Sequence, residues 1–516
     1  MGSSLSCVNA PHESEYEEEP WGKPKKRGDT LREAERLFRK ANPDYNTTEQ
    51  LDHLRAVDYP TLDKDGHVYL DYTGSGLYAE SQLRKHSELL RRNVFGNPHS
   101  LNPTSSAITA LGEEARNMVL RFFKASPDEY DVIFTPNASH ALKLVAESYP
   151  FTSNSEVLLL SDNHNSVHGI REFARVKGAA ISYVPVLMPD LRADEVMISM
   201  ALNKKPSERN DAFRLFAYPA QSNFTGVQHP LEWIAKAQSQ GWHVLLDAAA
   251  FVPTNQLDLS RWHPDFVPVS FYKMFGYPTG AGCLIVRKAA LSLMNRPWFA
   301  GGTVWGASVV ADDHVLLEGH EAFEDGTINF LNLPAVHIGL NHLKSIGMET
   351  IHERVSCLTD WLLKTLFSLH HANGNPLLII YGPPDIRQRG GTISFNFLTP
   401  KGNVVDERIV ETRASAIRIS LRTGCFCNSG PAEAAWNLSK EALHRAFNAK
   451  NAEKEYGREI MKEDFIKEIG MPSGGAVRIS VGLMSNFVDA YRFVEFARTF
   501  LDNFPSHDGL MPRQGC

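Results

Sequence analysis

Two cysteines lie one residue apart in the stretch RTGCFCNSG, residues 422–430. They are Cys425 and Cys427, and a cysteine thiolate can act as a nucleophile or as a metal ligand. A disulfide between them would close a very short and strained ring. The chain offers no second pair of ligands at a spacing typical of a metal site. The pattern therefore leaves a reactive thiol on a mobile loop, which Gly424 and Gly430 would permit, or two ordinary loop residues.

A lysine stands in SFYKMFGYPTGAGCLIV, residues 270–286, between an apolar run and a Gly/Pro turn. The aromatic residues beside Lys273 in the sequence are Phe271, Tyr272, Phe275 and Tyr277. An amine that is removed from water has a lowered pKa, as Schiff-base chemistry requires. The alternative is a lysine whose stem lies on an aromatic patch while its charge stays in water.

Together with three further polar residues, Lys273 forms a candidate cofactor site. Asp247 ends the apolar run HVLLD, and a carboxylate there could pair with the ring nitrogen of pyridoxal 5'-phosphate while Lys273 holds its aldehyde. Ser139, in TPNASHALK, opens a predicted helix whose free N–H groups and dipole favour a phosphate. His164, in DNHNSVHG, could stack on the ring. Together, in this order along the chain, these residues predict a pyridoxal phosphate enzyme.

The elements that must position these residues alternate between strands and helices. Short apolar runs with polar residues at their C-terminal ends occur in HVYLDYTGSG, DVIFTPNASHALKLVAESY, EVLLLSDNHNSV, AFRLFAYPAQSNFTG and HVLLDAAAFVPT. Runs of this kind, separated by helical stretches, are typical of a mostly parallel sheet that is buried on both faces. Ligands of such sheets bind at the carboxyl ends of the strands. We therefore expect an α/β fold with its site at that edge.

The composition and the apolar pattern of the sequence change along the chain. We expect a disordered tail over residues 1–28, a helical segment over 29–66 and a large cofactor-binding domain over 67–330. After about residue 330 a long helical pattern and the apolar runs TISFNFL, AIRISLRTG and AVRISVGL predict a smaller α+β domain, residues 331–516, that carries the cysteine loop.

Composition limits the class of protein and its compartment. The chain has 516 residues, 43% of them apolar and 22% charged, with a formal net charge of −7 and no basic block, so nothing favours nucleic-acid binding. Six scattered cysteines without an apolar leader favour free thiols and a cytoplasmic location. The start, MGSSLSC, also fits an N-terminal lipidation motif, with myristoyl on Gly2 and palmitoyl on Cys7 as a peripheral membrane anchor.

The sequence resembles class V aminotransferase-fold, pyridoxal phosphate-dependent enzymes of fold type I. Within them it is similar to the cysteine desulfurase-like domain of molybdenum cofactor sulfurases, over about residues 30–500. The stretches that carry the resemblance are VYLDYTGSGLY, NPHS, ALKLVAE, YPAQSNFTGV, LDAAAFVPT, SFYKMFGYPTG, EDGTINFL, RTGCFCN and VRISVGLMSN. The resemblance implies a mostly parallel, seven-stranded sheet in the large domain.

The resemblance also implies a role for each candidate residue. Lys273 is the Schiff-base lysine, Asp247 pairs with the ring nitrogen and His164 stacks on the ring. Phosphate-binding positions fall on Ser139 and Ser270, with Tyr272 where related desulfurases have a phosphate-contacting histidine. Asn223 falls near the ring oxygen, and Arg478 matches the arginine that clamps the substrate carboxylate. Thr327 falls where a neighbouring subunit reaches the phosphate, which implies a homodimer. No metal site is implied.

Among the related desulfurases the nucleophile stands five residues after the arginine of the R-T-G turn, which points to Cys427 rather than Cys425. The implied reaction takes sulfur from L-cysteine as a persulfide on Cys427 and releases alanine, after which a sulfur-acceptor protein or cofactor takes the sulfur. Lys273, His164 and Cys427 are then the catalytic residues.

Three departures from the family pattern keep other functions open. A complete molybdenum cofactor sulfurase has a further C-terminal domain, whereas this sequence ends at Cys516. Ala250 replaces a glutamine that often bonds the ring oxygen, and Ala432 replaces a further cysteine. One alternative is a stand-alone lyase or C–C bond-forming enzyme that acts on another amino acid in specialised metabolism. Another is a catalytically silent scaffold. The sequence leaves the sulfur acceptor and the substrate side chain undetermined.

Overall fold

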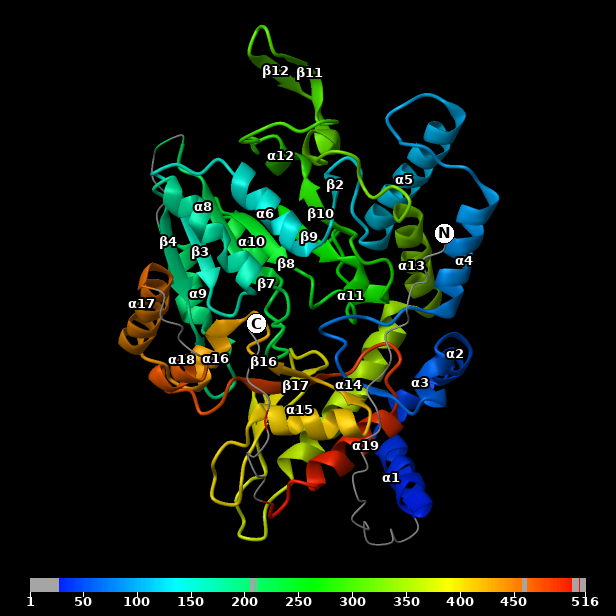
Figure 1. Ribbon diagram of the computed structural model, residues 1–516, viewed down its shortest axis with the longest axis vertical. Helices are drawn as coiled ribbons and strands as arrows, with labels where there is room; N and C mark the ends of the chain where they lie inside the picture. Colours follow the sequence, from blue (N-terminus) through cyan, green and yellow to red (C-terminus); the bar gives the residue numbers. More distant parts are fainter. Residues whose placement is uncertain (1–26, 205–208, 210, 457–461, 504–509, 511–516) are drawn as a thin grey trace, which may run out of the picture.

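The computed structural model describes residues 27–204, 209, 211–456, 462–503 and 510. The expected tail over residues 1–28, with Gly2 and Cys7, therefore lies almost entirely outside the described residues. Within them two sheets lie one below the other in Figure 1, a large one in cyan and green and a smaller one in yellow to red. No helix of the described part is long and apolar enough to cross a membrane.

The large sheet has seven strands in the order β2-β10-β9-β8-β7-β3-β4. All neighbouring pairs are parallel except those of β10, which runs antiparallel to β2 and to β9. The strands are β2 (Tyr130–Thr135), β3 (Glu156–Leu160), β4 (Ala180–Val184), β7 (Arg214–Pro219), β8 (His243–Asp247), β9 (Phe266–Ser270) and β10 (Gly282–Arg287). The predicted α/β fold with a mostly parallel seven-stranded sheet is confirmed.

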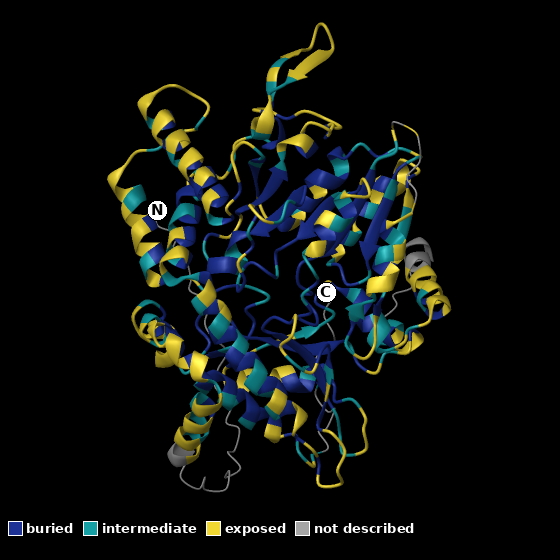
Figure 2. Ribbon diagram, turned by 180° about the vertical axis from the view of Figure 1, so that it is seen from behind, coloured by how far each residue is buried: buried dark blue, intermediate teal, exposed yellow. Residues whose placement is uncertain are grey.

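Both faces of this sheet are buried, as the unbroken apolar runs of its strands require. In β7, Phe216 and Tyr218 enter the core on one face, while Leu215 and Ala217 enter a second core on the other. The first face is covered by α5 (Pro103–Phe122), α10 (Glu232–Gln238) and α13 (Leu333–Ile346), the second by α6 (Ala138–Ser148) and α8 (Ile170–Val176). Figure 2 shows the buried strands between helices whose outer faces are exposed.

The smaller sheet is antiparallel, with the strand order β13-β14-β17-β16. Its strands are β13 (Leu378–Tyr381), β14 (Thr392–Phe397), β16 (Arg422–Gly424) and β17 (Ala476–Ser480), and its helices include α14 (Met348–Phe367), α15 (Glu407–Ala416) and α19 (Phe487–Arg498). β1 (Val68–Tyr69) pairs with β15 (Ile419–Ser420) beside this sheet, and Asp71 bridges to Ser480. The start of the expected 67–330 domain therefore lies against the smaller sheet, and the expected division of the chain stays a prediction.

The remaining elements extend these two units. The expected helical segment contains α1 (Arg27–Ala41), η1 (Pro43–Thr48), α2 (Gln50–Asp58) and α3 (Pro60–Lys64), and it docks on α14 through the Arg354–Asp52 ion pair of 2.7 Å. The others are α4 (Glu80–Arg92), α7 (Asn165–His168), β5 (Val186–Leu187), β6 (Arg192–Ala193), α9 (Glu195–Leu202), α11 (Phe271–Phe275), α12 (Lys288–Leu291), β11 (Val304–Ser308), β12 (Asp313–Leu316), η2 (Gly319–Phe323), α16 (Ser429–Ala435), α17 (Lys440–Tyr456) and α18 (Lys462–Glu468).

Candidate active site

A cavity of about 390 Å³ opens at the carboxyl ends of the strands of the large sheet. Lys273, on the short helix α11 directly after β9, and Asp247, the last residue of β8, both line it. Because β8 and β9 are parallel neighbours, their ends meet at one edge. Desolvation by burial lowers the pKa of Lys273, and the nearby Asp247 carboxylate partly opposes that shift. The amine is thus poised to lose its proton more easily than an exposed lysine.

The aromatic residues around Lys273 in the sequence do not surround it in space. Only Tyr272 lines the cavity. Phe271 and Phe275 lie one helical turn apart and point into the apolar core, and the Tyr277 hydroxyl lies 2.7 Å from Nδ1 of His86. The desolvation of Lys273 therefore comes from the whole cavity wall rather than from an aromatic cage.

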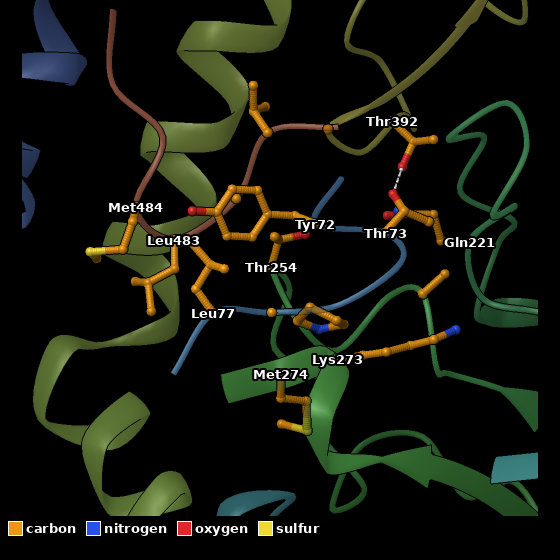
Figure 3. A pocket seen from close by; sticks show the side chains of 16 residues that line it. Tyr72, Thr73, Leu77, Gln221, Thr254, Lys273, Met274, Thr392, Leu483 and Met484 are labelled. Atoms are coloured by element: carbon orange, nitrogen blue, oxygen red, sulfur yellow. Dashed lines mark hydrogen bonds between the residues drawn. The ribbon is translucent and has the colours of Figure 1, made fainter. Parts of the chain in front are cut away.

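A second, smaller pocket lies behind the lysine (Figure 3). Its wall is mainly apolar and includes Tyr72, Leu77 and Met484, and a Thr73–Thr392 hydroxyl pair of 2.7 Å closes one side. Figure 3 shows the Lys273 side chain extended on the Gln221 side, away from Tyr72. The amine is therefore directed out of this pocket.

His164 stands at the end of the turn that follows β3, as the N-cap of α7. Its Nδ1 accepts a hydrogen bond from the Ser166 backbone N–H at 3.1 Å, which fixes the ring, and the residue lines the same cavity as Lys273. Burial lowers the pKa of His164, and the Asp247 carboxylate opposes this. A neutral, oriented imidazole in this place is suited to stack on a flat aromatic ring.

One end of the cavity has the groups that bind an anion. The first residues of α6 line it, among them Ser139, and the helix N-terminus offers backbone N–H groups and a positive dipole end. Ser270 also lines it and accepts a hydrogen bond from the Ala138 N–H at 2.9 Å. The Ser139 hydroxyl lies 2.7 Å from that of Ser166. Ser166 was not among the site residues predicted from the sequence. Because Ser270 and Asn137 already accept from the Ala138 and His140 amides, the serine hydroxyls and the positive end of the helix are what fit a phosphate monoester.

Thr327 lies outside this cavity. It lines an adjacent hollow of about 280 Å³, which shares Pro136 and Gly280 with the main cavity, and its hydroxyl accepts a hydrogen bond from Asn97 Nδ2 at 3.2 Å. Within one chain, Thr327 is therefore not brought together with the other candidate phosphate ligands.

Asn223 lies at the cavity, but its side chain also holds the cysteine loop. Its Nδ2 donates to the Phe426 carbonyl at 2.7 Å, and its Oδ1 accepts from Asn428 Nδ2 at 3.0 Å. Asn428, fully buried, also donates to Oδ1 of Asp162 at 3.1 Å. The predicted ring-oxygen ligand is thus linked directly to the residues on both sides of Cys427. Asn428 and Asp162 were missed from the sequence because their partners come from distant segments.

The residues on both sides of Cys427 are packed against the large domain, while the expected mobility of the cysteine loop stays a prediction. Cys427 is exposed, but Phe426 and Asn428 on either side are buried. A Cβ on Gly430 would lie 1.8 Å from the Ser161 carbonyl oxygen, so this glycine permits close packing of α16 rather than motion. None of the four cysteines that the structure describes, including Cys425 and Cys427, forms a disulfide. The thiol is presented on a short turn whose base is fixed.

Arg478, in β17, lies buried at the junction of the two sheets. Its guanidinium donates to Oδ1 of Asp71 at 3.1 Å and to the Asn223 carbonyl at 2.9 Å. Burial lowers the pKa of Arg478 to about 10, and the Asp71 carboxylate opposes this. Its Nε has no hydrogen-bond partner among the described residues. Arg478 is not among the residues that line the cavity around Lys273, and Asp71 balances its charge.

Comparison with known proteins identifies the family. The family model for class V aminotransferases matches residues 68–458, which is most of the chain. The chain belongs to the class V aminotransferase family. Family membership implies pyridoxal phosphate as the cofactor, and the site residues fit it. Lys273 faces Asp247, His164 can cover a ring between them, and the N-terminus of α6 with its serines can hold the phosphate.

The class V chain is similar to curated proteins named molybdenum cofactor sulfurase. It is 37% identical to that of Arabidopsis thaliana over 495 residues, covering 89% of this chain and 59% of the relative. It is 38% identical to the human protein over 470 residues, covering 86% of this chain and 51% of the relative. The chain therefore spans between about half and three-fifths of the length of these relatives.

Solved structures of similar fold include cysteine desulfurases. The apo enzyme of Thermococcus onnurineus superposes with a TM-score of 0.69 at 22% identity, covering 87% of this chain and 98% of that one. The Escherichia coli enzyme gives a TM-score of 0.65 at 20% identity, covering 87% and 99%. At these identities the likeness establishes the fold.

Proposed function

We propose that the chain is a pyridoxal phosphate-dependent sulfurtransferase that takes sulfur from L-cysteine. The observation that carries this proposal is that the turn bearing Cys427 is hydrogen-bonded, through the Phe426 carbonyl, to Asn223, which lines the same cavity as Lys273. The C–S bond of cysteine breaks, and its sulfur forms an S–S bond with Cys427. The carbon keeps the electron pair and gains a proton, which yields alanine, while the enzyme thiol is oxidised to a persulfide.

In this reaction each residue around the cavity has a separate role. The bound cofactor supplies an electron sink that makes the Cα proton of the substrate acidic. Lys273, with its lowered pKa, takes that proton and returns it. Asp247 would pair with the protonated ring nitrogen of the cofactor, and Arg478 would hold the substrate carboxylate through its guanidinium.

The same proposal includes a sulfur-acceptor protein or cofactor and a homodimeric assembly. The curated relatives named molybdenum cofactor sulfurase support a sulfur-acceptor protein or cofactor as the destination of the persulfide sulfur. The position of Thr327, in a hollow that adjoins the cavity instead of within it, supports a homodimer in which Thr327 serves the neighbouring subunit. Size-exclusion chromatography with light scattering tests that assembly, and a monomer under assay conditions contradicts it.

The function is tested with cofactor-loaded protein, L-cysteine and a reductant, with alanine and sulfide measured together. Equal yields of both products are expected from the wild type, with both lost in Cys427→Ala. Cys425→Ala is the matched control, two positions earlier on the same loop, and should keep most of the activity. Alanine formation that survives Cys427→Ala contradicts the assigned nucleophile, and no alanine from the wild type contradicts the substrate.

A further inference from the structure

The turn that carries Cys427 has an unusual backbone. Phe426 and Cys427 have φ angles of +56° and +52°, so two consecutive residues with side chains occupy the left-handed region. Such conformations cost free energy and persist only where the surroundings impose them.

Hydrogen bonds fix the turn on both sides of the thiol. The Phe426 carbonyl accepts from Asn223 Nδ2 at 2.7 Å, and the Cys427 carbonyl accepts from the Asn165 backbone N–H at 2.7 Å. The next residue, Asn428, bonds to Asp162. These partners lie after β3 and β7, so the turn is attached to the same strand ends that build the cavity.

The Phe426 side chain links this turn to the arginine of the site. The Arg478 guanidinium carbon lies 4.5 Å from the centre of the Phe426 ring, which is a cation–π contact. The Phe224 ring packs on Phe426 as well, with 5.4 Å between centroids. Phe426 is only 8% exposed and belongs to a small apolar cluster with Val186, Leu191, Phe224, Tyr381, Ala432 and Ala476. One residue thus touches Arg478 through its ring and positions Cys427 through its backbone.

We propose that Phe426 is a positioning residue that sets the carboxylate-binding arginine and the sulfur-accepting thiol relative to each other. This inference rests on the proposed function and deepens it. The ring holds the guanidinium of Arg478 in the orientation that leaves Nε unpaired, while the left-handed backbone at residues 426 and 427 presents the thiol. With the turn held by these hydrogen bonds, the acceptor of the sulfur would meet it at Cys427 beside the cavity.

Two substitutions separate the aromatic face from mere volume. Phe426→Leu keeps an apolar side chain of smaller volume but removes the π face, whereas Phe426→Tyr keeps the π face. Val186→Ala is the control, because it removes volume from the same cluster without a contact to Arg478. For cofactor-loaded proteins we expect Phe426→Leu to raise the KM for L-cysteine roughly threefold to tenfold, from the usual strength of a cation–π contact. Phe426→Tyr and Val186→Ala should stay within about twofold of the wild type.

A second readout does not depend on turnover. Amide hydrogen exchange over residues 422–429 should be faster in Phe426→Leu than in the wild type and unchanged in Val186→Ala, with residues 243–247 of β8 as an internal reference. Equal KM and equal exchange in Phe426→Leu and wild type overturn the proposal, as does a Phe426→Tyr variant that behaves like Phe426→Leu. If the wild type makes no alanine while the exchange pattern is as expected, the proposed function fails and the positioning of the turn stands.

Discussion

The carboxylate of Asp71 lies between two arginines, with Oδ1 3.1 Å from an Arg478 guanidinium nitrogen and Oδ2 2.7 Å from one of Arg422. Asp71 comes from the segment after β1, Arg478 from β17 and Arg422 from the first position of β16. A Cβ on Gly74 would lie 2.5 Å from this carboxylate, so the chain is shaped closely around it. Asp71 thus connects Arg478, the proposed substrate-binding arginine, to β16, the strand that leads to Cys427.

Asp71→Asn should therefore destabilise the protein and weaken substrate binding. It leaves the buried Arg478 charge without its counter-charge, and breaking a buried pair from one side costs about 3 kcal/mol. Chemical denaturation should show a loss of that order, and the KM for L-cysteine should rise. Asp65→Asn, at an exposed position in the preceding turn, is the control and should change the free energy of unfolding by less than about 0.5 kcal/mol. An Asp71→Asn protein as stable as this control would contradict the assigned role.

Lys273→Arg should abolish covalent attachment of pyridoxal phosphate, because a guanidinium does not lose its proton to react with the aldehyde. After borohydride reduction, peptide mass spectrometry should find the cofactor on the peptide that contains Lys273 in the wild type, and on no peptide in the variant. Attachment of the cofactor to another lysine in the wild type would remove Lys273 from the site.

Gly430→Ala should damage the cysteine turn although the change adds only one methyl group. The new Cβ would meet the Ser161 carbonyl oxygen at 1.8 Å, and overpacking of this kind costs about 1–3 kcal/mol. We expect a lower melting temperature and slower alanine formation. Gly301→Ala, where a Cβ meets nothing within 4 Å, should match the wild type in both. A Gly430→Ala protein with wild-type activity would show that the turn tolerates displacement.

His320 provides a pH-dependent contribution to stability outside the site. Its Nδ1 lies 3.3 Å from Oδ2 of Asp131. Burial acts to lower the pKa of His320, but the hydrogen bond to Asp131 together with the negative charges of Glu324 and Asp131 outweighs burial and raises the pKa overall. Since the folded-state pKa lies above the unfolded value, the pair stabilises fully below about pH 6.5 and loses this contribution as the pH rises through the folded-state pKa. The stability lost in His320→Gln should thus be larger at pH 5.5 than at pH 8.5. An equal loss at both pH values would show that the charged form contributes nothing.

Much of the site could be predicted because its residues follow strands. Asp247 is the last residue of β8, Ser139 follows β2 through a short turn, and Lys273 follows β9. Once the apolar runs predict a parallel sheet, these residues must meet at one edge. The assignment of individual roles needed the resemblance to the family, since a carboxylate at a strand end is common in itself.

The sequence by itself determined the α/β fold, the edge of the sheet where the site lies and the residue types that can hold pyridoxal phosphate, because all three follow from local periodicity and strand-end chemistry. Only the tertiary structure decided which aromatic residues face the lysine, that Asp71 balances Arg478, and that the turn at Cys427 is hydrogen-bonded to the segments after β3 and β7. These contacts join residues from both sheets that are hundreds of positions apart. Local sequence patterns do not predict such pairings, because the contacts form only when the two sheets pack together.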